Sequence, residues 1–183
     1  MRLALTVDGV HYNITEPRPF SKSYASEKEG YDAALGYEFV LHTHKPKLAW
    51  MNGPFPAGKG DKYNLRQGLL DAIRKKQRDR GNNAKIIADK GYWAVDLLDA
   101  ISLRNEFDPS HIKRLKDNAL SRQETFNGWT KDYKCCIKKF LHDRRHNPNQ
   151  EHPRHKACVE AICVTIQYEL DLGCKHLFDP YPM

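Results

Sequence analysis

The chain has 183 residues, of which 40% are hydrophobic, and a formal net charge of +7. This length allows one domain with a sizeable core, no apolar run approaches the roughly 20 residues that span a membrane, and the N-terminus is too short and polar for a signal peptide. The positive charge suits a polyanionic partner but does not single out nucleic acid, because many soluble proteins are mildly basic.

The first part of the sequence predicts three strands. Apolar residues alternate in the stretch Leu3–Ile14 (LALTVDGVHYNI) as far as the Asp8-Gly9 pair, where we expect the strand to break. Two further strands are predicted over Leu35–Thr43 and Lys47–Gly53. The short turn between them indicates a hairpin.

A Pro- and Gly-rich loop over 53–60 leads to a helix and a fourth strand. Apolar residues recur at helical spacing over 61–77, which places Asp61 at or near the N-cap of the predicted helix. The stretch 81–89 (GNNAKIIAD) predicts a turn and then a strand that ends on Asp89.

From Ser110 onward the pattern is helical. One apolar stripe recurs every three or four residues and comprises Phe126, Trp129, Tyr133, Ile137 and Phe140. A charged stretch over 142–155 interrupts it, and a final helix is predicted over Lys156–Gly173. Five cysteines lie in this part without a CxxC pair, so we expect reduced core cysteines in an intracellular protein.

Several acidic residues stand where a hard cation could be bound. Asp8 and Asp89 end predicted strands, and Glu124 lies on the long helix outside the apolar stripe. Phosphodiester cleavage by paired Mg²⁺ ions needs carboxylates from separate, rigid elements. Spacing alone leaves the alternatives open, namely turn residues at Asp8 and Asp89, a helix cap at Asp61 and a solvated helix acid at Glu124.

Five sequence blocks, taken together, carry a resemblance to a known family. In chain order they are TVDGVHY, NGPFPAGKGDKYNL, IIADKGYW, SRQETFNGWTKDY and FDPYPM, and they cover nearly the whole chain. They resemble the DDE-superfamily endonuclease domain of Harbinger-type and related cut-and-paste transposases. The resemblance implies an α/β, RNase H-like fold with a mixed sheet flanked by helices. It also implies metal-dependent cleavage of DNA, with strand transfer as a further step.

Carried over residue by residue, the resemblance implies a catalytic triad of Asp8 in the DG pair, Asp89 in ADKGY and Glu124 in RQET. The implied cofactor is Mg²⁺ or Mn²⁺. Asp61 is an alternative second acid, because the family's GPFPAGKGD block also ends in a recurrent acid. We favour Asp89, because the fourth strand of an RNase H-like sheet ends beside the first. Asp61 would then lie at the edge of the metal site or cap the helix.

The same resemblance implies that Lys131, two turns after Glu124, contacts DNA phosphate, and Lys138 extends that face. A basic loop is a second candidate DNA surface through Arg144, Arg145 and Arg154. His11 is compatible with a role beside the metal and equally with a polar strand position.

Two other patterns are set aside. The letters GPFPAGKG lack the Ser or Thr after Lys and the strand–helix context of a P-loop. No closed zinc spacing is formed by His142, His146, His152, His155, Cys135 and Cys136.

We therefore expect a single catalytic domain over 1–183 that lacks the N-terminal DNA-binding region of such transposases, because only seven residues precede Asp8. The expected partners are DNA, a separate DNA-binding protein and a second copy of the chain, and the expected location is the nucleus. One alternative is a catalytically silent relative that binds DNA or a protein. Another is an RNA-cleaving nuclease of the same fold.

Overall fold

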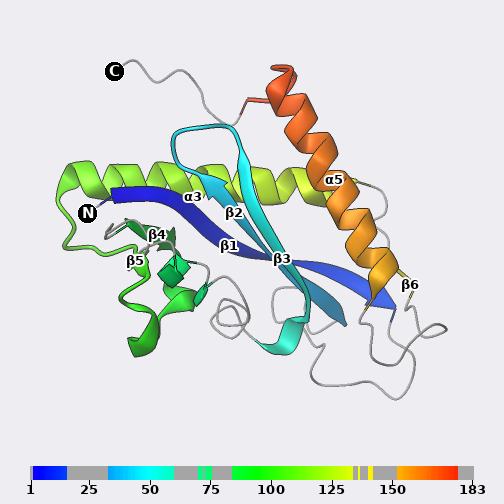
Figure 1. The fold of residues 1–183 in the computed structure, drawn as a ribbon, viewed down its shortest axis with the longest axis horizontal. Helices are drawn as coiled ribbons and strands as arrows, with labels where there is room; N and C mark the ends of the chain where they lie inside the picture. The colour runs from blue at the N-terminus through cyan, green and yellow to red at the C-terminus, as the bar shows by residue number, and fades with distance from the viewer. Residues whose placement is uncertain are drawn as a thin grey trace.

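A computed structural model describes residues 2–15, 33–59, 70–71, 73–75, 84–133, 136, 140–141 and 152–176. Its centre is a mixed sheet in which five strands follow the order β3-β2-β1-β4-β5 (Figure 1). The fold therefore belongs to the α/β class, as the sequence predicted.

The long strand β1 (Arg2–Thr15) organises the sheet. It pairs antiparallel with β2 (Ala34–His42), which forms a hairpin with β3 (Leu48–Pro56). On its other side β1 pairs in parallel with β4 (Ala84–Ala88), and β4 pairs in parallel with the edge strand β5 (Ile101–Leu103). A two-residue strand, β6 (Phe140–Leu141), pairs with the end of β1.

Two long helices, α3 (Ser110–Lys131) and α5 (Pro153–Asp171), cover one face of the sheet. They share a core with alternate residues of β1 and β2, in which Phe126 of α3 and Ile166 of α5 are fully buried. Alternation along a strand sends Val10, Tyr12 and Ile14 of β1 to this face.

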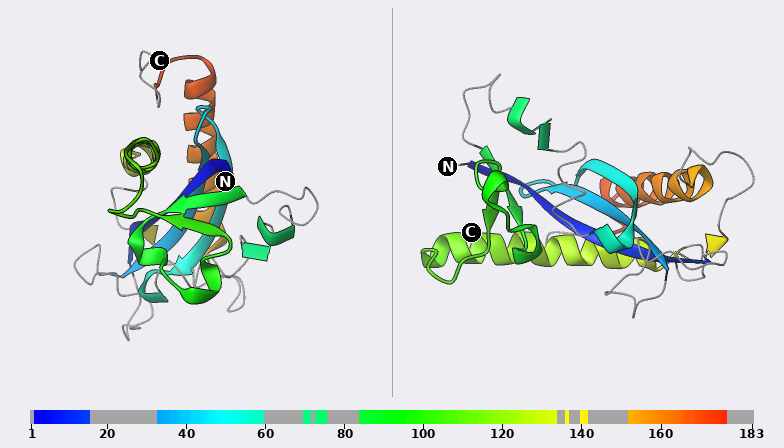
Figure 2. Two further views of the ribbon diagram at one scale, coloured as in Figure 1. Left: turned by 90° about the vertical axis from the view of Figure 1, so that its left-hand side faces the viewer. Right: turned by 90° about the horizontal axis from the view of Figure 1, so that it is seen from below.

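The opposite face packs against a second core. It is covered by Leu70 and Ile73 and by a segment that contains the 3-10 helices η4 (Lys90–Tyr92) and η5 (Val95–Leu97). In the right-hand view of Figure 2, α3 and the helical fragment at 70–75 lie on opposite sides of the sheet. Within the described residues no helix is long and apolar enough to cross a membrane.

The sequence predicted a break in β1 at the Asp8-Gly9 pair, and this prediction is wrong. The strand continues to Thr15. Asp8 pairs with Phe39 of β2, and Gly9 pairs with Glu38. Because β2 supplies ladder partners on both sides of the glycine, the strand passes through a position that sequence alone marks as a turn. Asp8 therefore lies in the middle of a central strand.

The hairpin and the final helix also have different limits from those predicted. β3 includes the first residues of the predicted Pro/Gly loop, and a 3-10 turn, η3 (Ala57–Lys59), follows it. α5 begins at Pro153 rather than Lys156, because proline is compatible with the first helical position, where its missing N–H costs nothing. Arg154 and His155 therefore belong to a helix and not to a basic loop.

The predicted stripe on α3 is the largest departure. The helix ends at Lys131, Phe140 lies in strand β6, and the residues that α3 buries include several polar ones, namely Lys116, Gln123, Asn127 and Thr130. Phe126 is buried as predicted, whereas Trp129 and Tyr133 are only partly buried and Ile137 lies outside the described residues. β5 was not predicted at all.

Candidate active site

Asp8 stands on the face of β1 that α3 covers. The neighbouring residue Val7 belongs to the core on the opposite face, and Val10 belongs to the core shared by α3 and α5. Strand alternation therefore directs the half-buried Asp8 carboxylate toward α3.

Asp89 follows β4 directly and lies beside Asp8. Val7 is the register partner of Ala88, so the next residue of each parallel strand is one of the two aspartates. Neighbouring strands are about 4.8 Å apart, which places the two backbone positions side by side. Asp89 is exposed and caps η4, where its Oδ1 accepts a hydrogen bond from the Lys90 backbone N–H. The capping role and a metal-binding role are compatible, because the second carboxylate oxygen is not used by the cap.

The residue of α3 that contacts Asp8 is Asn127. Its Nδ2 donates a hydrogen bond of 2.7 Å to Asp8 Oδ2, and the side chain is 8% exposed. Gln123, one turn earlier and fully buried, donates from Nε2 to Asn127 Oδ1 at 3.3 Å. The Asn127 amide is thereby oriented with its nitrogen toward the carboxylate.

The contact continues along the strand as a polar seam between β1 and α3. The Tyr12 hydroxyl donates to Thr130 Oγ1 at 2.6 Å, and Thr130 Oγ1 donates to the backbone carbonyl of Asn127 at 2.7 Å. Burial raises the pKa of Tyr12 well above its ordinary value, so this phenol remains a hydrogen-bond donor at neutral pH. The seam fixes the position of α3 relative to Asp8.

Glu124 lies three residues before Asn127 and is exposed. On an α-helix these two positions are neighbours, about 60° apart around the axis. Asp8 and Asp89 thus lie side by side, on β1 and directly after β4. Glu124 lies on the exposed side of α3, the helix that packs over Asp8. In the described part of the chain no three His, Cys, Asp or Glu side chains are grouped closely enough to bind one metal ion.

The other predicted site residues are dispersed. Lys131 is exposed at the last turn of α3, and Arg154 is exposed in the first turn of α5. His11 is buried and, by strand alternation, lies on the face of β1 opposite to Asp8. Outside the described residues lie Asp61, Lys138, Arg144 and Arg145.

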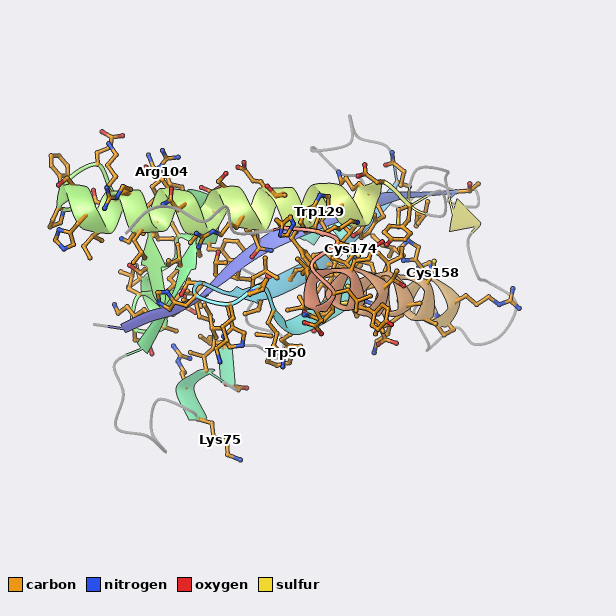
Figure 3. All side chains as sticks on the ribbon, turned by 90° about the horizontal axis from the view of Figure 1, so that it is seen from above. Trp50, Lys75, Arg104, Trp129, Cys158 and Cys174 are labelled. Atoms are coloured by element: carbon orange, nitrogen blue, oxygen red, sulfur yellow. The ribbon has the colours of Figure 1, made fainter. Side chains whose placement is uncertain are left out.

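Arg122 of α3, which precedes Glu124 by two residues, has a structural contact. Its Nη1 donates to the Thr43 carbonyl at 2.9 Å and ties α3 to the end of the hairpin strand β2. Trp129, labelled in Figure 3, packs near the end of α5, where the Lys175 ammonium lies 5.1 Å from its ring centroid. Both residues therefore support the packing of the helices.

The histidines and cysteines of the C-terminal part also have structural positions. His155 Nδ1 is 2.7 Å from the Tyr37 hydroxyl, and both rings are buried. Burial lowers the pKa of His155 to about 4 and raises the pKa of the Cys163 thiol to about 12. Cys136 and Cys163 are core residues, as predicted, but Cys174 is exposed.

Two adjoining hollows lie near the carboxyl ends of β4 and β5, and Asp89 lines one of them. One has a volume of about 640 Å³ and is lined by Asp89, Lys90, Arg104, Asn105, Glu106 and Lys113. The other, of about 570 Å³, shares Lys90, Arg104 and Asn105 with it and extends along β5. Arg104, labelled in Figure 3, is held by Asp117 of α3 at 2.8 Å.

The residue that sequence reasoning missed is Asn127. It lies three residues after Glu124 on α3, and its side chain is an amide rather than one of the carboxylates expected to bind metal. The relevant signal is a run of polar residues at helical spacing, Gln123, Asn127 and Thr130, beside the apolar stripe.

No protein-family model, no curated protein and no solved structure matches this chain.

Proposed function

We propose that this chain is a divalent-metal-dependent DNA endonuclease of the transposase type with an RNase H-like fold. The observation that carries the proposal is the placement of Asp8 and Asp89 at matched register on neighbouring parallel strands. The five sequence blocks that resemble the DDE-superfamily endonucleases include both of these residues.

The sheet supports the RNase H-like assignment. The strands β1, β2 and β3 form an antiparallel meander. On its other side β1 pairs in parallel with β4, which pairs in parallel with β5. A first acid in the middle of the central strand and a second acid at the end of the adjacent parallel strand suit this topology. The helix that crosses the first acid, α3, carries the fourth block of the resemblance, which contains Glu124.

The site has the chemistry of a hard-cation site. Asp8 and Asp89 supply carboxylate oxygens from two neighbouring strands of one sheet, and Asp89 lines a surface hollow. Asp8, Asp89 and Glu124 would hold Mg²⁺ or Mn²⁺, with Asp61 at the edge. A divalent ion bound there supplies a water of lowered pKa and positive charge against the phosphate oxygens.

The chain's own residues would orient the acid and the DNA. Asn127 fixes one oxygen of Asp8 by a hydrogen bond, so the carboxylate has one preferred orientation. The cations Lys131 and Arg154 occupy exposed positions on the two helices that cover this face, where they could contact phosphate in addition to their own partners. DNA bound in this way would be held chiefly by its backbone.

The test is nicking of supercoiled plasmid DNA in Mg²⁺ or Mn²⁺ by the wild type and by Asp8→Asn. We expect nicking by the wild type and a loss of at least a hundredfold in the variant. Equal nicking by both proteins would end the endonuclease proposal. A parallel assay on an RNA–DNA hybrid separates cleavage of DNA from cleavage of RNA.

A second candidate is a DNA-binding module without cleavage activity. One observation favours it: Glu124 is exposed on the flank of α3, and the described acids do not form a group of three. This candidate predicts DNA binding by the wild type and by Asp8→Asn with equal affinity, and nicking by neither.

A further inference from the structure

The exposed edge of the sheet beside Asp89 has a feature that phosphodiester cleavage by itself does not use. Among the residues that the structure describes, β5 pairs only with β4, and the 570 Å³ hollow lies along it. Its residues Ile101, Ser102 and Leu103 line the hollow, and Asn105 follows at the point where this hollow meets the one that contains Asp89. The two hollows share Lys90, Arg104 and Asn105, and we call the pair the β5 groove.

The β5 groove has an apolar wall with one large aromatic ring. Trp93, which follows η4, lines it and is 59% exposed. Further apolar surface comes from Leu98, which is 42% exposed, and from the half-buried Leu103. An indole that is exposed to this extent in a hollow can accept a flat ring against its face.

The rim of the groove is cationic. Lys85 Nζ donates to the Leu98 carbonyl at 2.5 Å, and this uncharged partner holds the ammonium in place. Lys113 of α3 is exposed at the opposite end, and Lys90, which lies between them, pairs with Glu106 at 3.7 Å, with both side chains mostly solvated. Such an exposed pair is weak and opens readily to another anion.

The floor of the groove is rigid. Lys116 is 3% exposed, donates to the Leu103 carbonyl at 2.7 Å and pairs with Asp108 at 2.8 Å. These bonds join α3 to the end of β5 and to the loop after it. The walls are therefore formed before any ligand arrives.

We propose that the β5 groove binds one unpaired nucleotide of DNA, with the base stacked on Trp93 and the phosphates at Lys90 and Lys113. The inference rests on the proposed endonuclease function, because it places the unpaired nucleotide next to the DNA strand that would enter the hollow lined by Asp89. An apolar wall with an exposed indole and a cationic rim match the base and the phosphate of a nucleotide in one site. A paired base inside a duplex cannot present its face to the indole.

The rival occupant is an acidic peptide that adds a strand to β5. The exposed edge spans only three residues, which offers few main-chain hydrogen bonds, and a peptide backbone gives Trp93 no flat partner. The groove chemistry therefore favours the nucleotide. Polyglutamate serves as the competitor that decides between them.

The experiment measures binding of a single-stranded oligonucleotide that carries 2-aminopurine, in EDTA, so that neither metal nor cleavage is involved. We expect quenching of 2-aminopurine by the wild type and an affinity for single-stranded DNA that Trp93→Ala lowers roughly ten- to a hundredfold. Trp93→Phe should recover most of the loss. Trp50→Ala is the matched control, because Trp50 lies on β3 at the other edge of the sheet (Figure 3) and is 37% exposed.

Equal affinity of Trp93→Ala and Trp50→Ala for single-stranded DNA would overturn the nucleotide site. Displacement by polyglutamate as effective as that by unlabelled DNA would also overturn it and would favour a peptide. Binding that depends on Trp93 together with no nicking by the wild type would retain the site and remove the endonuclease function. Nicking with no dependence of binding on Trp93 would do the reverse, so the two proposals fail separately.

Discussion

Asn127 decides how Asp8 is presented. The amide donates to one carboxylate oxygen and is itself held by Gln123. Asn127→Leu keeps a similar volume but leaves a partly buried carboxylate and a buried amide without this partner, so we expect a loss of roughly 1–3 kcal/mol in unfolding free energy. Urea denaturation at pH 7 measures it. Asn118→Leu, at a half-exposed position of the same helix, should cost much less.

The same position distinguishes a metal site from a purely structural seam. Asn127→Asp places a second carboxylate beside Asp8, and the repulsion should destabilise the metal-free protein. A divalent ion that binds there would relieve the repulsion, so Mn²⁺ should raise the melting temperature of Asn127→Asp more than that of the wild type. An identical Mn²⁺ effect on both proteins would show that no cation binds next to Asp8.

His155 gives the stability of the protein a specific pH dependence. Burial holds its folded-state pKa near 4, below the ordinary 6.5, so between these pH values the unfolded chain binds a proton that the folded chain does not. The stabilisation is complete above pH 6.5 and is lost as the pH falls toward 4. A shift of this size corresponds to roughly 3 kcal/mol.

The measurement is the unfolding free energy at several pH values between 4 and 7. His155→Phe removes the titrating group but keeps a ring against Tyr37, so its stability should fall less over this range than that of the wild type. His111→Phe is the control, because His111 is exposed on α3 and its removal should leave the slope unchanged. Parallel pH curves for the wild type and His155→Phe would contradict the assignment.

At the scale of elements, two glycines predict substitutions of opposite sign. Gly53 in β3 has φ +128°, and a Cβ there would lie 2.7 Å from Tyr37 Cδ1 and 2.9 Å from the Gly36 carbonyl oxygen. Gly53→Ala should therefore cost about 1–3 kcal/mol. Gly128 is helical with nothing near its Cβ position, so Gly128→Ala should stabilise α3 by about 0.5–1 kcal/mol. Thermal melts of both variants test the pair, and a shift of the same sign in both would refute this explanation.

Strand patterns predicted β2, β3 and β4 within a few residues, because each alternates or is continuously apolar between turn signals. β5 was missed because three residues, ISL, give no periodicity, and only pairing with β4 makes them a strand. The turn predicted at Asp8 failed for a related reason. The hydrogen-bonded pairing with β2 overrides the preference of Gly9 for a turn. The residues next to Gly9 in the sequence carry no information about its partners on β2.

The burial of α3 could not be predicted from apolar residues alone. Gln123, Asn127 and Thr130 are buried because they bond to one another and to β1, and a pattern of hydrophobicity counts them as solvent-facing. Asp8 and Asp89 were predicted as site residues because carboxylates at strand ends have a small set of uses, although Asp8 lies in the middle of β1. Their common register became visible only when β1 and β4 were paired.

At the scale of the molecule, the candidate site and the β5 groove meet at one edge. The parallel strands β4 and β5 end there, and in α/β sheets ligands bind outside the carboxyl ends of such strands. Asp89 belongs to both, since it follows β4 and lines the first hollow. The aspartate that is expected to bind metal and the cations that are expected to bind DNA are therefore held by the same rigid elements.

The stability of the whole protein should report on the metal. An ion that binds only the folded state stabilises it by RT ln(1 + [L]/Kd), about 2.7 kcal/mol at a hundredfold excess over Kd. We expect Mn²⁺ to raise the melting temperature of the wild type and to have little effect on Asp8→Asn or Asp89→Asn, because an amide oxygen is a weaker, uncharged ligand. Without metal, these variants should be at least as stable as the wild type wherever two carboxylates repel each other.

Glu124→Gln completes this series, because Glu124 lies on the flank of α3 and not at the Asn127 contact. If it supplies the third ligand, its variant should lose most of the Mn²⁺ shift that Asp8→Asn loses. Asp132→Asn, at an exposed position just beyond α3, is the matched control and should retain the full shift. A wild-type shift that survives in Asp8→Asn would place the ion elsewhere on the molecule. A shift that is lost in Asp8→Asn and Asp89→Asn but kept in Glu124→Gln would define a site built by the two strands alone.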